Sequence, residues 1–390
     1  MLLLIYFVPN SFIDLDSGLI ICKSDCTDFD RLSNTLLFEG AYEDYGGDPH
    51  TATTYRGFIT LIATLKFILG DAWELGVLIF NSMLSLFAII SVSILLAPLR
   101  SLAIFLCVTL FASALNIRFL VYSKFLLTDF TFGLLAVLSF VCVGCGFVQR
   151  NKNLLITALF LGVLLCFWRP TGIFILALVC LVVIIYFIPT KHRDAAVLAA
   201  PLMVSLTLFC VVAYVTYLLG SNAVDLSLFS VGLRDNLELI KVLNFYGHDA
   251  DPALGSQAVN FPYKLTIPHD GSFQGIVIAN FHRFYYSLQI WVDQYSLRHN
   301  LYRSGLYLIL YGSVLLYLYS CFRKRIVEKQ LITLILLFSY VILLFSVVGF
   351  EERYFSPIDF FLNIMLATVV AGCTRRLVKG DENQAKAHAD

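Results

Sequence analysis

Long uninterrupted apolar runs constrain the fold of this chain more than any other feature. They recur from residue 75 to residue 373 and are separated mostly by short polar connectors. Lipid admits only helices or closed barrels, because every backbone polar group must be satisfied internally, and a helix crosses a hydrocarbon core of about 30 Å with about 20 apolar residues. The runs lack the period-two alternation of membrane strands. They therefore predict membrane-spanning helices.

Composition agrees, since 59% of the residues are hydrophobic, 14% are charged and the mean hydropathy is +0.82. Soluble domains have about 45–50% apolar and about 25% charged residues. The clearest predicted spans are 75–96, 101–115, 128–147, 154–168, 172–187, 195–219, 305–320, 331–348 and 357–373.

The apolar residues 1–9 are too short to cross a membrane and lack a cleavage-site pattern, so we expect an incomplete first helix or a truncated start rather than a signal peptide. Counting them, the sequence predicts an all-α polytopic membrane protein with about ten transmembrane helices in a single membrane domain, residues 1–390. No internal repeat is visible.

Basic residues fall on every second connector. They are Arg100; Arg150 and Lys152; Lys191 and Arg193; Arg323, Lys324, Arg325 and Lys329; and Arg375, Arg376 and Lys379. The positive-inside rule makes that face cytoplasmic. The other face then carries a first outer loop, residues 10–74, and a long outer loop, residues 220–303, while residues 381–390 are predicted to be a disordered cytoplasmic tail.

Two segments of the first outer loop have the pattern of helices that lie on a membrane surface. Residues 28–38 place Phe29, Leu32, Leu36 and Leu37 at helical spacing among polar residues. Residues 57–70 are only fourteen in number and contain Lys66, which makes them marginal for a span. We expect both segments to be interfacial helices.

Asp25, Asp28 and Asp30 lie in the first outer loop, just past the first hydrophobic run of the chain. At a water–membrane boundary, partial desolvation raises the pKa of a carboxylate toward the working range of a general base, and a nearby cation limits the rise. These acids are therefore candidates for catalysis. The alternative is a solvated acidic face on an amphipathic helix.

The run from Asp25 through Phe29, Ser33, Leu36-Leu37 and Gly40 to Tyr42 resembles the first outer loop of GT-C fold, polyprenyl-phosphate-dependent membrane glycosyltransferases. The similarity is to the branch that contains protein mannosyltransferases and the aminoarabinose transferase. Its members show an acid, an aromatic residue four positions later, a Leu-Ala pair, a Leu-Leu pair, then Gly and an aromatic residue; Ser33 stands here for the Ala.

Four further elements resemble the same family in the same order. They are Tyr55-Arg56-Gly57-Phe58, where Ile59 replaces the family's Pro; residues 123–129, ending in Asp129; Arg169-Pro170-Thr171-Gly172; and Glu352-Arg353-Tyr354 with Pro357. The resemblance spans nearly the whole chain, and every element falls on the predicted outer face.

The resemblance implies a site residue by residue. Asp25 is expected to be the general base, Asp129 to orient the site, and Arg353 to hold the donor phosphate with help from Arg56 or Arg169. The other expected substrate-binding residues are Asp28, Tyr55, Glu352 and Tyr354.

Charge at membrane depth supports these assignments independently of the resemblance. An arginine in lipid costs about 2.5–3.5 kcal/mol on insertion scales, so such residues are functional candidates that need a partner. The partner of Arg169 or Arg353 is either a phosphate or a structural mate, with Asp129 or Glu352 as the candidate mates.

The sequence thus predicts a membrane glycosyltransferase that moves a sugar from a polyprenyl-phosphate-linked donor to a glycan, lipid or protein acceptor. Its location would be the inner (plasma) membrane with an extracytoplasmic active site, or the ER membrane in a eukaryote. The alternatives are a polysaccharide polymerase or ligase, and a transporter or flippase of lipid-linked sugars. Membrane lipid is an expected partner, whereas neutral net charge offers no footprint for nucleic acid.

His50 beside Asp48 in the first outer loop is one candidate metal ligand, and the long outer loop holds five others of similar weight. These five are His248, Asp249, Asp251, His269 and Asp270, and their spacing fits no metal signature. We therefore predict no metal site and no other cofactor, and a divalent cation stays open as an alternative.

Overall fold

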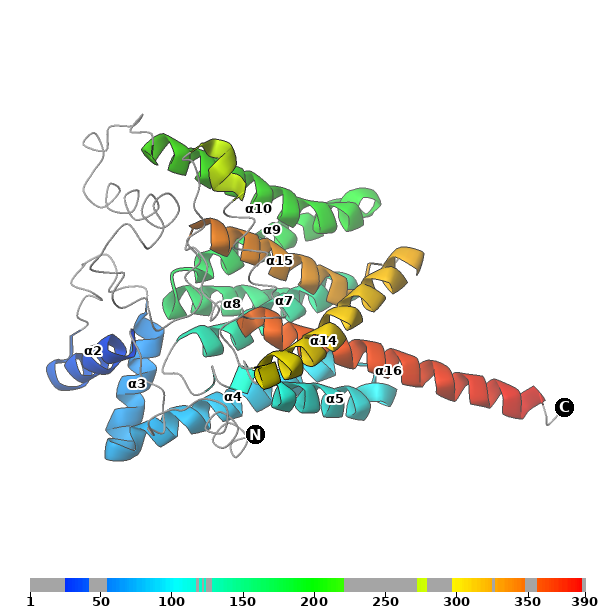
Figure 1. The fold of residues 1–390 in the computed structure, drawn as a ribbon, viewed down its shortest axis with the longest axis horizontal. Helices are drawn as coiled ribbons and strands as arrows, with labels where there is room; N and C mark the ends of the chain where they lie inside the picture. Colours follow the sequence, from blue (N-terminus) through cyan, green and yellow to red (C-terminus); the bar gives the residue numbers. More distant parts are fainter. Residues whose placement is uncertain are drawn as a thin grey trace.

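The computed structural model describes residues 25–41, 55–116, 119–120, 123, 128–220, 272–278, 297–324, 327–347 and 356–387. Every element in these ranges is a helix (Figure 1). The predictions for residues 1–9 and for most of the long outer loop lie outside the described residues.

Each of the nine predicted apolar stretches forms a helix. These helices are α4 (Trp73–Leu96), α5 (Leu102–Leu115), α7 (Thr128–Gln149), α8 (Lys152–Trp168), α9 (Gly172–Tyr186), α10 (Thr190–Gly220), α14 (Leu297–Lys324), α15 (Lys329–Val347) and α16 (Ser356–Ala387). Five stretches are long and apolar enough to cross a membrane: Arg56–Leu96, Thr128–Gln149, His192–Val215, Asn300–Lys324 and Pro357–Thr374. Leu99–Leu115, Lys152–Trp168, Gly172–Tyr186 and Lys329–Leu344 are shorter apolar helices. The described chain is thus helical, and the length and apolar composition of its helices are those of a membrane protein. The count of ten spans stays a prediction.

Helix α7 is the centre of the bundle. All of its residues from Thr128 to Phe147 are buried, and it packs against α4, α8, α9, α15 and α16. The surrounding helices expose large apolar side chains, among them Phe87 of α4, Phe160 of α8 and Phe322 of α14. Such a surface suits lipid rather than water, because soluble proteins rarely expose apolar patches of this extent.

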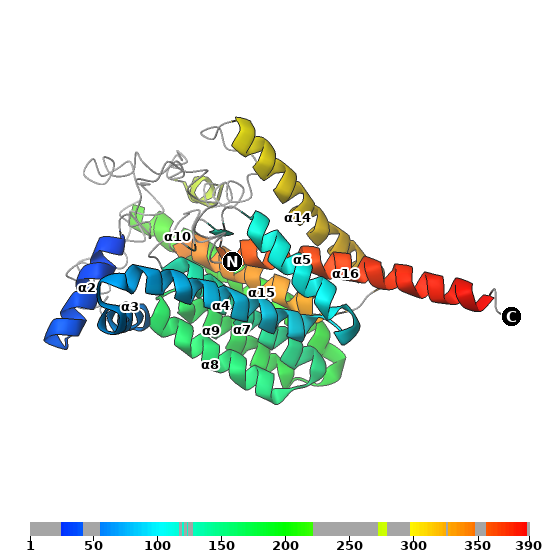
Figure 2. The ribbon, with the colours of Figure 1, turned by 90° about the horizontal axis from the view of Figure 1, so that it is seen from below.

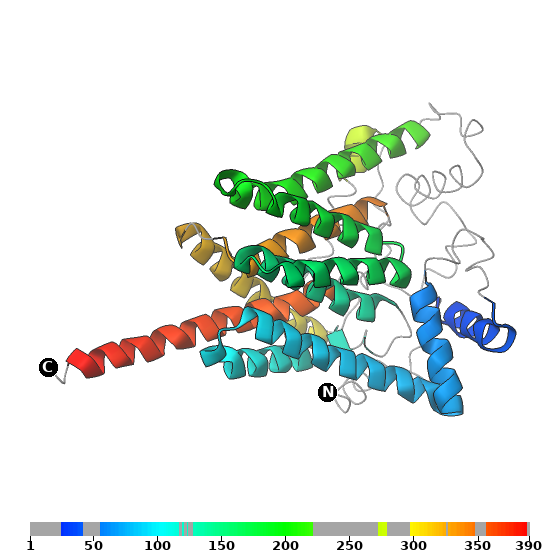
Figure 3. The same ribbon diagram turned by 180° about the vertical axis from the view of Figure 1, so that it is seen from behind.

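Helices α2 (Asp25–Glu39) and α3 (Arg56–Leu69) occupy the two segments that were predicted to be interfacial. Gly70 ends α3 with a positive φ of 53°, a conformation that favours glycine, and the 3-10 turn η2 (Gly70–Ala72) leads into α4. Figures 1 and 3 show α3 running across the end of the bundle while α4 runs along it. Their position at a membrane surface stays a prediction.

The described basic connectors meet at the opposite end of the bundle from α2 and α3 (Figure 2). The Tyr186 hydroxyl, at the end of α9, donates to the Arg150 carbonyl between α7 and α8, at 3.4 Å. The Arg193 guanidinium of α10 lies 5.0 Å from the ring centre of Phe147 near the end of α7, and Lys329 at the start of α15 contacts the end of α4. We call this the basic end, and the other the α2 end. The described connectors that carry basic residues thus lie at one end of the bundle, and α2 and α3 lie at the other.

Helix α16 continues to Ala387, whereas residues 381–390 were predicted to be disordered. Residues 381–387 contain Glu, Gln, Ala and Lys, which favour helix once a preceding helix supplies the nucleus. In Figure 1 this part of α16 projects beyond the other helices.

Candidate functional site

A buried ion pair joins two of the predicted site residues. Asp129 is the second residue of α7, and Arg169 directly follows α8. An Arg169 guanidinium nitrogen contacts a carboxylate oxygen of Asp129, and the residues are only 4% (Asp129) and 7% (Arg169) exposed. A carboxylate in the first turn of a helix and a cation at the end of another both interact favourably with the helix dipoles. Asp129, one of the candidate mates for Arg169, is therefore its partner in a buried ion pair.

The turn Arg169-Pro170-Thr171-Gly172 sets the position of this arginine. Arg169 has extended backbone (φ −159°, ψ 144°), as expected before proline, and its N–H donates to the Leu165 carbonyl at 2.9 Å. Gly172 packs against the backbone of Leu165 so closely that a Cβ atom would overlap it. Pro170 and Gly172 therefore make a tight turn between α8 and α9, in which Arg169 is buried.

Trp168 makes a second link between α8 and α7. Its Nε1–H donates to the Thr131 hydroxyl at 2.7 Å, and both residues are buried. Thr131 lies two residues after Asp129 on α7. The end of α8 is thus fixed to the start of α7 by a hydrogen bond as well as by an ion pair.

Aromatic contacts connect α2 and α3 to this point. The Phe29 ring of α2 lies edge-on to Tyr55 at 5.3 Å and to Phe58 at 5.1 Å, and Phe58 lies edge-on to Trp168 at 6.0 Å. Gly57 allows the approach, because a Cβ atom there would lie 3.0 Å from the Trp168 ring. Edge-to-face pairs add about 0.5–1.5 kcal/mol each beyond area burial. The acidic helix and the Asp129–Arg169 pair therefore belong to one packed unit at the α2 end.

Sequence reasoning did not identify a second buried carboxylate near this end. Asp359, fully buried in the first turn of α16, accepts a hydrogen bond from the Tyr307 hydroxyl of α14 at 2.8 Å. Phe119 lies 5.0 Å from Phe130 and stacks on Phe360 at 5.9 Å, so the starts of α7 and α16 are neighbours. An aspartate inside a predicted span was the available signal.

The other predicted residues of the first loop fall at different places. Asp25 is the first residue of α2, and its side chain lies outside the described part. The Asp28 carboxylate is 3.9 Å from Arg31 on the same helix, and both side chains are more than 40% exposed. Tyr55 packs on Phe29, and Arg56 is an exposed residue at the start of α3. Asp28 and Arg56 thus lie on the surface, near the aromatic contacts.

Glu352, Arg353 and Tyr354 lie outside the described residues, as do the candidate metal ligands of both outer loops. Within the described ranges, no group of three or more His, Cys, Asp or Glu side chains could hold a metal ion.

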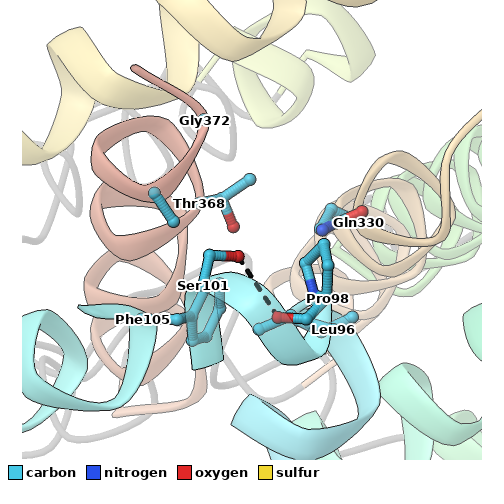
Figure 4. Close-up of a pocket in the computed structure, with 9 residues that line it drawn as sticks. Leu96, Pro98, Ser101, Phe105, Gln330, Thr368 and Gly372 are labelled. Carbon is cyan, nitrogen blue, oxygen red and sulfur yellow. Dashed lines mark hydrogen bonds between the residues drawn. The ribbon is translucent and has the colours of Figure 1, made fainter. Parts of the chain in front are cut away.

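A pocket at the basic end is separate from these residues (Figure 4). It lies where the connector between α4 and α5 meets α15 and α16, and its polar groups include Gln330 and Thr368. Its Ser101 hydroxyl donates to the Pro98 carbonyl at 3.3 Å. It contains none of the predicted site residues.

No family model, curated protein or solved structure matches this chain. Function is therefore inferred from the residues, the motifs and their geometry.

Proposed function

We propose that this protein is a membrane glycosyltransferase that moves a sugar from a polyprenyl-phosphate carrier to a glycan, lipid or protein acceptor. The reaction would take place on the extracytoplasmic side of the inner membrane, or on the lumenal side of the ER in a eukaryote. The observation that supports it best is the buried Asp129–Arg169 pair, which packs through Trp168, Phe58 and Phe29 against the helix that begins with Asp25.

In the proposed reaction, the Asp25 carboxylate takes the proton of the acceptor hydroxyl. The acceptor oxygen then forms a bond to the anomeric carbon from the face opposite the phosphate, and the bond from that carbon to the phosphate oxygen breaks. The leaving group is the lipid phosphate, so the enzyme has to supply chiefly positioning, a base and charge stabilisation.

Arg353 would hold the donor phosphate, with help from Arg56 or Arg169. An arginine about 4 Å from a phosphate gains on the order of 4 kcal/mol per unit charge at an effective dielectric of 20, and its fork reaches two oxygens. Asp129 keeps Arg169 at the α2 end until a phosphate competes for it. Asp28, Tyr55, Glu352 and Tyr354 would complete the substrate contacts.

The positions of the buried charges favour an enzyme over a transporter. Asp129 and Asp359 lie in the first turns of their helices, and Arg169 lies just after the end of α8. Charges that line a transport pathway are expected near the bilayer midplane. Buried charges at helix ends suit chemistry at the rim of the bundle.

The test is a transfer assay with purified protein in liposomes, labelled polyprenyl-phosphate sugars and candidate acceptors. Asp25→Asn should lower turnover by about 10²–10⁴-fold, the usual contribution of a general base. The matched control is Asp71→Asn, at an exposed residue of η2, which should retain wild-type turnover. Near-normal transfer by Asp25→Asn removes that residue from the role. Movement of the donor across the membrane without transfer identifies a flippase, and consumption only of lipid-diphosphate oligosaccharides identifies a polymerase or ligase.

A further inference from the structure

Lys66 of α3 is a buried lysine that contacts α2. Its ammonium donates to the Asp30 carboxylate at 2.6 Å, to the Asp30 carbonyl at 2.9 Å and to the Asn34 side-chain oxygen at 2.7 Å. It also lies 4.9 Å from the ring centre of Trp73, the first residue of α4. An ammonium has three donors, and here all three are used within the protein.

These contacts fix orientation as well as attachment. Asp30 and Asn34 are four residues apart, so they lie one turn apart on the same face of α2. A lysine that binds both of them opposes rotation of α2 about its own axis and sliding along it. Apolar packing of Phe29 and Leu32 alone would tolerate such movements more readily, because dispersion contacts have little directionality.

The position of α2 determines where Asp25 lies. Asp25 is the first residue of this helix, one turn before Phe29, and Phe29 is the ring that connects α2 to Phe58 and so to Trp168 beside Arg169. A shift of α2 on α3 would therefore move residue 25 relative to the Asp129–Arg169 pair. Misplacement of a catalytic group by about 1 Å can cost about 10²-fold in rate.

We propose that Lys66 is a positioning residue for the proposed sugar transfer, which fixes α2 on α3 and thereby sets the place of Asp25 at the α2 end. The inference rests on the proposed function. It differs from a purely structural role because it predicts a loss of turnover without loss of fold or of donor binding.

The kinetic test compares Lys66→Met with Lys66→Arg and with Lys152→Met. Methionine keeps the apolar stem of lysine and removes the hydrogen-bond donors. Arginine keeps a cation that can bind carboxylate and amide oxygens. Lys152 is an exposed lysine at the basic end, and the same substitution there serves as the control. Lys66→Met should lower kcat by at least about tenfold, with the KM for the donor within about twofold. Lys66→Arg should recover much of the loss, and Lys152→Met should match the wild type. Adding Asp30→Asn to Lys66→Met should lower kcat little further, because both changes remove one interaction.

The structural test is hydrogen exchange, measured by mass spectrometry on the same detergent-solubilised proteins. Amides of residues 27–38 should exchange at least about tenfold faster in Lys66→Met than in the wild type, while those of α7 remain protected. Unchanged protection of α2 in Lys66→Met would show that Lys66 does not hold the helix. Faster exchange with unchanged kcat would exclude the positioning role.

If the wild-type protein transfers no sugar, the proposed function and the positioning role both fail. Hydrogen exchange then still decides whether Lys66 fixes α2, so the two failures can be told apart.

Discussion

Removing one partner of the Asp129–Arg169 pair should destabilise the protein far more than removing both. The side chains are 3% and 8% exposed, so either charge left alone would remain inside the bundle. Breaking a buried pair in this way costs about 3–5 kcal/mol, whereas replacing both members by apolar residues of similar size is about neutral or stabilising. Arg169→Leu should therefore lose about 3–5 kcal/mol, and Asp129→Leu with Arg169→Met should lose little.

The assay is equilibrium unfolding in liposomes or micelles titrated with denaturing detergent, with fluorescence of the neighbouring Trp168 as one probe. The control is Arg31→Met, which breaks the ion pair between Arg31 and Asp28. Their side chains are 48% (Arg31) and 42% (Asp28) exposed, and an exposed pair of this kind contributes about 0–1 kcal/mol to stability. Single substitutions that each cost under about 1 kcal/mol and add in the double variant would refute a desolvated pair. Because Asp129 is proposed to orient the site, and Arg169 is one of the two arginines proposed to help Arg353 hold the phosphate, the stable double variant should transfer sugar poorly.

Two further substitutions examine the packing around the site. Gly172→Ala should cost about 1–3 kcal/mol or more in the same unfolding assay, because its Cβ would overlap the backbone of α8; Gly312→Ala in α14, which has open space around it, should be neutral or slightly stabilising. Tyr307→Phe should cost about 1–3 kcal/mol, since it removes a donor from the buried Asp359 carboxylate. Tyr319→Phe, on the exposed face of the same helix, should have no measurable effect, and equal effects of the two tyrosine changes would contradict the buried hydrogen bond.

Hydropathy located the helices better than their ends. The predicted span 305–320 is part of a longer helix, which begins at Leu297. Hydropathy missed the first turns of this helix because they contain the polar residues Arg298, Asn300 and Arg303. A hydropathy window reports the apolar part of a helix, whereas the helix itself ends where backbone hydrogen bonding ends. Polar residues that favour helix also carried α16 to Ala387.

The candidate site was predictable in part. Arg169 and Asp129 were identified because charges at membrane depth need partners, and one of the two mates considered for Arg169 is correct. Lys66 was interpreted only as an obstacle to a span. Its contacts with Asp30 and Asn34 depend on how α2 lies on α3, and a tertiary arrangement of two amphipathic helices is not encoded in the periodicity of either one. Asp359 could have been found by applying the same rule to the span 357–373.

Photo-cross-linking of a polyprenyl-phosphate-sugar analogue, followed by peptide mapping, decides whether the donor binds where the proposal places it. The proposal predicts labels in residues 25–41, 55–69, 167–172 and 352–354, and competition by unlabelled donor. It also predicts weaker labelling after the double substitution Asp129→Leu with Arg169→Met, which should keep its stability, than after Arg31→Met. Labels confined to the basic end, around Arg100, Arg150 and Lys329, or spread along the length of α7, would contradict a transfer site at the α2 end.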